Sequence, residues 1–149
     1  MRKPLLVLIV LAFPAAALPP AAPEGAAMRF RALDVFVDSG AEPLAAWQIE
    51  IISSDPRSKI VGVEGGDTKH FAPAPYYDPR ALEGGRIIIA AFTTEEGPPA
   101  GRVRVARVHM TESGAAGEPT YSARLMAGAR QGGDRIDARV ELVGKGDNR

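Results

Sequence analysis

Two neighbouring carboxylates, Glu95 and Glu96, come nearest to an acid–base pair in this sequence. Cleavage of a glycosidic bond needs two carboxyl groups that face one bond across about 5–9.5 Å. Adjacent acids at the end of a strand point apart, and these two stand directly before a glycine–proline turn at residues 97–99. The two histidines, His70 and His109, are too far apart in the sequence to indicate a metal site. We therefore expect a solvated turn at the glutamates rather than a catalytic site.

The motifs of other common active sites are missing as well. The sequence contains no Gly-x-Ser-x-Gly nucleophile elbow. The glycines of residues 62–66 lack the spacing and the following helix of a phosphate-binding loop. Without cysteine, the chain can form neither disulfides nor thiolate metal sites, and it has no cysteine nucleophile. We expect no catalytic residues and no metal-binding residues.

The candidate ligand contacts lie in a long segment without strand patterning, residues 65–85. Phe71, Tyr76, Tyr77 and Asp78 fall in it, among prolines that keep it out of a β-ladder. Rigid aromatic rings give a binding surface a large contact area for little lost entropy, and loops this long are more often functional or disordered than idle. These four residues are therefore the predicted ligand-binding residues. The alternative is that the segment folds over one end of the domain and its rings plug it.

Alternation of apolar and polar residues predicts the strands that must position this segment. In residues 45–51 the apolar side chains share one parity and the polar ones share the other, and residues 135–142 repeat the pattern. Such alternation is typical of a sheet with one face on a core and one in water. We therefore expect the only tryptophan, Trp47, in the core. Further candidate strands are residues 33–38, 60–63, 86–93, 102–110 and 121–127.

Two of these strands carry extra signals. Residues 87–92 are apolar on both faces, which predicts a central strand covered on both sides. In residues 102–110 the apolar parity changes between Val105 and Ala106, which predicts a β-bulge, because one extra residue reverses the facing of those that follow. No helical stripe of ten or more residues interrupts the strands. The predicted fold class is therefore all-β, an antiparallel two-sheet β-sandwich.

The N-terminus has the layout of a secretory signal peptide. Arg2 and Lys3 precede an apolar run over residues 5–13, and small residues follow as far as Ala17. The run is too short for a stable membrane anchor, which needs about 20 residues. We expect cleavage after Ala17, a secreted or periplasmic protein, and no transmembrane anchor. The expected division of the chain is a signal peptide at 1–17, a leader rich in proline and alanine at 18–27, the sandwich domain at 28–145 and a polar tail at 146–149.

The charge of the chain bears on its partners. The sequence holds 18 basic and 18 acidic side chains, so its formal net charge is zero. Binding to a phosphate backbone relies on a strong positive field. We therefore expect no nucleic-acid partner.

Several segments, taken in order, resemble a known family. They are Leu33-Asp34-Val35-Phe36-Val37 with a glycine turn at Gly40, Leu44-Ala45-Ala46-Trp47-Gln48-Ile49-Glu50-Ile51, Asp55-Pro56 before Ile60-Val61-Gly62-Val63, and the strands that follow Gly85 and Gly101. The series is similar to that of cohesin-like domains, bacterial extracellular β-sandwiches related to some carbohydrate-binding modules, and the likeness covers residues 30–143. The resemblance implies a jelly-roll topology and a non-catalytic binding role, with a protein or a polysaccharide as the partner. Some related modules also hold a structural calcium ion, although the aspartates here lack calcium-loop spacing.

Two other functions stay open from the sequence. One is a small secreted hydrolase that uses carboxylates of the long segment, such as Asp67 and Asp78. The other is a structural subunit that packs exposed strand edges into an envelope assembly. The residues and the resemblance together predict an exported, non-catalytic binding module.

Overall fold

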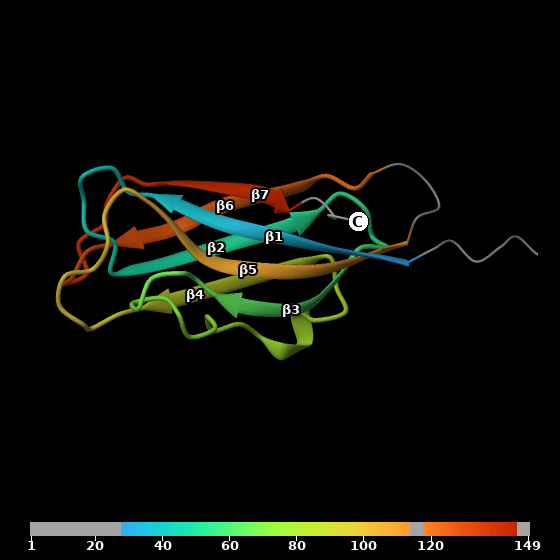
Figure 1. The fold of residues 1–149 in the computed structure, drawn as a ribbon, viewed down its shortest axis with the longest axis horizontal. Coiled ribbons are helices and arrows are strands. Elements are labelled where there is room, and N and C mark those ends of the chain that lie inside the picture. Colours follow the sequence, from blue (N-terminus) through green and yellow to red (C-terminus); the bar gives the residue numbers. More distant parts are fainter. Residues whose placement is uncertain (1–27, 114–117, 146–149) are drawn as a thin grey trace, which may run out of the picture.

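The computed structural model describes residues 28–113 and 118–145, which form seven strands and one short 3-10 helix (Figure 1). The elements are β1 (Met28–Asp38), β2 (Ala46–Ser53), β3 (Lys59–Gly65), η1 (Pro79–Ala81), β4 (Arg86–Phe92), β5 (Arg102–Ser113), β6 (Tyr121–Ala129) and β7 (Arg139–Lys145). The predicted signal peptide, leader and polar tail, residues 1–27 and 146–149, lie outside the described residues.

The strands form two antiparallel sheets. Sheet A has the order β3-β5-β1-β7, and sheet B has the order β4-β2-β6. Consecutive strands always lie in opposite sheets, so every connection between described strands crosses from one sheet to the other. The two-sheet, all-β prediction is confirmed. The jelly-roll topology stays a prediction.

The core lies between the sheets and contains the tryptophan, as the alternation predicts. Trp47 on β2 is 2% exposed, and Ile49 and Ile51 on the same face are buried with it. Phe71 meets the indole edge-on, with ring centroids 6.0 Å apart and ring planes at 69°. Full burial of one large apolar side chain contributes about 1.5–3 kcal/mol. The other buried members of the core are Leu33, Val35, Val37, Leu44, Ile60, Ile87, Ile89, Val105, Ala106, Val108 and Met110.

The β-bulge predicted in β5 is confirmed. The pairing of β1 with β5 shifts by one residue between Val35 and Phe36, which leaves Val105 without a partner across the ladder. Val105 and Ala106 are consequently both buried, because the extra residue turns two successive side chains toward the core.

The prediction that residues 87–92 form a central strand is wrong. The strand β4 is at the edge of sheet B, and β2 occupies the centre. The open edge of β4 is covered by the segment before η1, because the backbones of Tyr76 and Ala90 exchange two hydrogen bonds of 2.8 and 3.0 Å. An edge covered in this way does not need the charged side chains that usually protect an open strand. This cover allows apolar residues on both faces of β4.

A second departure concerns residues 135–142. The strand β7 begins only at Arg139, and the residues before it form one isolated bridge, between Ala129 and Arg135. Ile136 and Ala138 still pack against the core, partly buried. The alternation therefore predicted the facing of these side chains correctly, although the segment crosses from sheet B to sheet A without a ladder.

A buried polar pair joins the two sheets at one end of the sandwich. The hydroxyl of Tyr121 on β6 donates to Oε1 of Glu112 on β5 at 2.6 Å. The guanidinium of Arg31 lies 2.9 Å from the same carboxylate. Burial, together with this hydrogen bond, raises the pKa of Tyr121 to about 12. Glu112 is thus paired and hydrogen-bonded, as a buried charge has to be.

Replacement of Trp47 tests the inward parity of β2. We predict that Trp47→Ala lowers the free energy of unfolding by about 3–5 kcal/mol, because it leaves a cavity beside Phe71. Urea denaturation monitored by circular dichroism measures this loss. Phe30→Ala is the matched control, since Phe30 is an exposed aromatic residue on β1 and its removal leaves no cavity. Near-native stability of the Trp47 variant would contradict the packing described above.

Candidate functional site

The structure divides the four predicted ligand-binding residues between the core and the surface. Phe71 is 1% exposed and packs on Trp47, and Tyr77 is partly buried against the same core. These two positions match the plug alternative. Tyr76 is 71% exposed, and Asp78 is exposed beside η1. Of the four predicted residues, only Tyr76 and Asp78 therefore face solvent.

Close backbone contacts fix the course of the segment. The amide of Gly66 donates to the carbonyl of Phe71 at 2.6 Å, which holds the turn that carries the Phe71 ring inward. A Cβ at Gly65 would overlap the carbonyl oxygen of Ala72, so only glycine fits there. Farther along, Asp78 accepts the backbone N–H of Arg80 at 3.0 Å and caps η1.

Tyr76 forms a stacked pair with Phe92, a residue that the sequence patterns did not indicate. The ring centroids lie 6.2 Å apart and the planes differ by 11°. Phe92 is 62% exposed at the end of β4. The backbone holds both rings in place: Phe92 belongs to β4 of sheet B, and the backbone of Tyr76 is hydrogen-bonded to Ala90 of the same strand. The pair therefore forms a flat apolar surface that is open to solvent and fixed in place.

A charged cluster lies across the same outer face of sheet B. Glu50 on the central strand receives hydrogen bonds from Nε of Arg86 on β4 and from Nη2 of Arg124 on β6, both at 2.9 Å. The Glu50 side chain is only 9% exposed, whereas the two arginines are 60% and 67% exposed. The hydrogen bonds from Arg124 and then Arg86 lower the pKa of Glu50 below its usual 4.5. The carboxylate thus stays ionised between its partners.

A groove connects the charged cluster with the segment that carries Tyr76. Its volume is about 670 Å³, and its lining includes Ile88 of β4 and the Asp78–Arg80 ion pair. Arg86 belongs both to this groove and to the charged cluster. We define the "sheet B face" as Tyr76, Phe92, Ile88, Glu50, Arg86 and Arg124. This face combines exposed rings with exposed guanidinium groups on one rigid sheet.

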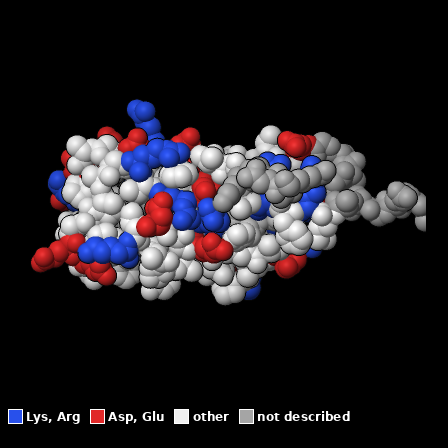
Figure 2. Space-filling view, in the orientation of Figure 1, with Lys and Arg blue, Asp and Glu red and all other residues white. Residues whose placement is uncertain are grey.

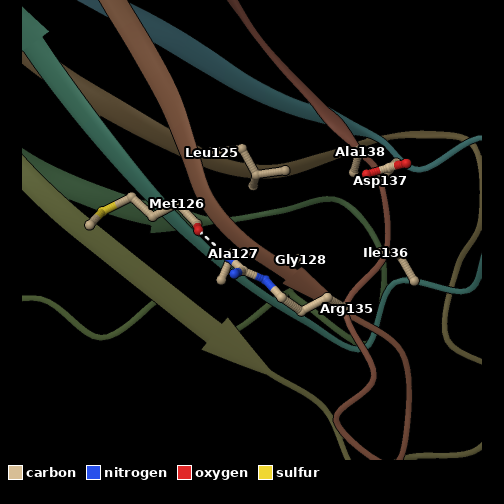
Figure 3. A pocket seen from close by; sticks show the side chains of 8 residues that line it. All are labelled: Leu125, Met126, Ala127, Gly128, Arg135, Ile136, Asp137 and Ala138. Carbon is tan, nitrogen blue, oxygen red and sulfur yellow. Dashed lines mark hydrogen bonds between the residues drawn. The ribbon is translucent and has the colours of Figure 1, made fainter.

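A second hollow, of about 480 Å³, lies between β6 and the segment that leads to β7 (Figure 3). Its two charged side chains do not converge. Nη2 of Arg135 donates to the carbonyl of Met126 at 2.7 Å, while Asp137 lies apart from it beside Ala138. The remaining lining is apolar side chains and backbone. Such a lining offers no paired groups for acid–base work.

The other side of the molecule carries a mixed charge pattern. Figure 2 shows basic and acidic side chains next to one another where β1 and β5 lie in front. Arg107 donates to Asp34 at 2.6 Å, and His109 lies 2.9 Å from Glu64. The opposite charges of Arg107 and Asp34, paired across neighbouring strands, stabilise the sheet modestly. Within residues 28–113 and 118–145, no cluster of three or more His, Asp or Glu could hold a metal ion.

The titratable groups around Glu95 do not form a relay. Nδ1 of His70 lies 3.4 Å from the Thr93 hydroxyl and 3.9 Å from the Glu95 carboxylate. Both contacts use one ring nitrogen, whereas in a catalytic triad one ring nitrogen takes the proton of the nucleophile and the other donates to a carboxylate. Glu95 also lies 3.5 Å from Lys69 and is exposed, as expected for a solvated turn.

The structure does not bring together the two aspartates of the hydrolase alternative. Asp67 lies beside Arg104 of sheet A, with 3.7 Å between the charged groups, and its amide bonds to the carbonyl of that residue. Asp78 instead caps η1 beside β4 of sheet B. Each carboxylate has its own arginine, which is Arg104 on β5 for Asp67 and Arg80 in η1 for Asp78.

Comparison of the chain with models of protein families, with curated proteins and with solved structures finds no match. In the part of the chain that the structure describes, no helix has the length and apolar character needed to cross a membrane.

Because the Glu50 carboxylate is held between two arginines, we predict that its protonation in acid destabilises the fold. Because the pKa of Glu50 is lower in the folded chain than in the unfolded chain, its ion pairs stabilise the fold above about pH 4.5 and stop doing so as the pH falls through the folded pKa. Glu50→Gln should therefore narrow the difference in unfolding free energy between pH 7 and pH 3, measured by urea denaturation.

The matched control for this prediction is Glu95→Gln. Glu95 is an exposed glutamate whose side chain is ion-paired only at 3.5 Å or more. This variant should keep the pH dependence of the wild-type chain. An unchanged pH dependence in Glu50→Gln as well would show that the two arginines do not act on the Glu50 carboxylate.

Proposed function

We propose that the chain is an exported, non-catalytic binding module that recognises a protein or a polysaccharide through the sheet B face. The observation that carries the proposal is the stacked pair of Tyr76 and Phe92, two large rings that are 71% and 62% exposed. Aromatic rings are enriched among the residues that dominate binding energy at protein interfaces. Phe92 lies on the edge strand β4 and Tyr76 is paired with that strand, so both rings are held in position to contact a ligand.

The stacked pair of Tyr76 and Phe92 is held rigidly, which favours a binding role over an incidental exposed patch. Phe92 ends β4, and the backbone of Tyr76 is hydrogen-bonded to Ala90 of the same strand. A ligand that covers the rings would therefore remove apolar surface from water without first ordering a loop. Pre-organised surfaces of this kind gain affinity because less conformational entropy is lost on binding.

The wider features of the chain support the same proposal. The signal-peptide layout of residues 1–17 implies export, and the cohesin-like resemblance implies a binding module. The carboxylates of the hydrolase alternative are separated, as described above. The edge of β4, which an assembly subunit could use for strand pairing, is occupied at Ala90 by Tyr76.

Removal of both rings tests the proposal. Wild-type protein is first screened on a glycan array and in a pull-down from secreted proteins, and its affinity for the recovered ligand is then measured by titration calorimetry. We predict that the double variant Tyr76→Ala, Phe92→Ala binds at least about tenfold more weakly, because loss of one hot-spot residue alone costs 2 kcal/mol or more.

The matched control removes an aromatic ring from the other sheet. Phe30 on β1 is 67% exposed, so Phe30→Ala removes one exposed ring and leaves the sheet B face intact. The control should bind like wild type, and both proteins should keep the wild-type melting temperature within a few degrees. Equal affinities of the double variant and the control would place the ligand elsewhere.

A further inference from the structure

The sheet B face presents positive charge to solvent although an acid lies at its centre. Glu50 uses one carboxylate oxygen for Arg86 and the other for Arg124. The carboxylate is almost fully covered, while both guanidinium groups remain mostly exposed. Each guanidinium carries five N–H donors, so donors remain on each group for an incoming ligand. A ligand that reaches this point therefore meets cationic hydrogen-bond donors and no exposed carboxylate of Glu50.

The geometry of these donors selects the ligand chemistry. A guanidinium group matches a carboxylate with two parallel hydrogen bonds and stays charged at any physiological pH. Glu50 holds Arg86 and Arg124 in position, which reduces the entropy that each would lose on binding an anion. The charged end of the sheet B face is therefore complementary to a carboxylate.

The spacing along β4 selects the shape of the ligand. Arg86, Ile88, Ala90 and Phe92 alternate onto the outer face of one strand. The rise of about 3.3 Å per residue places the first and the last of them about 20 Å apart. Tyr76 lies beside the far end, stacked on Phe92. One ligand that contacts the rings and the arginines together must therefore be an elongated chain.

We propose that the sheet B face binds a polysaccharide of acidic sugars, lying along β4. The apolar C–H faces of its sugar rings pack on Tyr76 and Phe92, and its carboxylates pair with Arg86 and Arg124. This inference rests on the proposed function and names the ligand class for the same face. An extended peptide added as a further strand is disfavoured, because Tyr76 already occupies the edge of β4 at Ala90.

The test compares two forms of one polymer that differ only in charge. Polygalacturonate carries a carboxylate on each sugar, and its methyl-esterified form has the same backbone without the charge. Binding of the full chain to both forms is measured by titration calorimetry at low and high salt. We expect polygalacturonate to bind at least about tenfold more tightly than the ester, and added salt to weaken this binding.

A single arginine variant locates the charge. Arg124→Gln removes one exposed guanidinium and leaves Glu50 paired with Arg86, so the sheet keeps its central ion pair. We expect about a fivefold loss of affinity for polygalacturonate, since an exposed ion pair contributes up to about this much. The matched control is Arg139→Gln, which removes an exposed arginine from β7 of sheet A. This control should bind polygalacturonate like wild type.

The possible outcomes separate the inference from the proposed function. Equal binding of the two polymers, or equal affinities of Arg124→Gln and Arg139→Gln, overturns the acidic ligand. So does binding to neither polymer. In these cases the proposed function still stands if a neutral polysaccharide or a purified protein binds and the Tyr76→Ala, Phe92→Ala variant loses it. Both proposals are overturned if polygalacturonate binds equally well to the wild type, to the Tyr76→Ala, Phe92→Ala variant and to Arg124→Gln.

Discussion

The contact between Trp47 and Phe71 sets the course of the long segment between β3 and β4. It joins the central strand of sheet B to the long segment between β3 and β4, because the Phe71 ring packs edge-on against the indole inside the core. With Phe71 held inward, the chain continues along the open edge of β4 and pairs with it at Ala90. Tyr76 is thereby left outside the core, against Phe92. The buried contact and the pairing at Ala90 together place Tyr76 beside Phe92.

The same arrangement explains why the sheet B face is suited to binding. Sheet B holds its aromatic pair through strand pairing and its arginines through Glu50, so neither part has to become ordered when a ligand arrives. The entropy lost when flexible groups become ordered on binding is a main reason why buried area does not determine affinity. Several buried or half-buried titratable groups are instead paired in ways that stabilise the sheets, as for Glu112 with Tyr121 and Asp34 with Arg107.

The sequence predicted the features that depend on local alternation and missed those that depend on distant partners. Parity along one strand was enough to place Trp47 in the core and to locate the bulge at Val105. The strand β4 can lie at the edge of sheet B because Tyr76 pairs with it. Apolar residues on both faces of a strand do not reveal such a pairing. Within the irregular segment no periodicity separates inward from outward rings, so Phe71 and Tyr76 could not be told apart. The arginine partners of Glu50 are 36 and 74 residues away in the chain.

Hydrogen exchange at the amides of Tyr76 and Ala90 shows whether the segment is held along β4. Because the backbone bonds between Tyr76 and Ala90 hold the segment along β4, both amides should exchange slowly in the full chain, and so should the paired amides of β2 and β4. Nuclear magnetic resonance resolves the two amides individually. If both amides exchange at the rate of an unstructured peptide, the segment is not held along β4. Tyr76 and Phe92 would then not form a fixed aromatic surface.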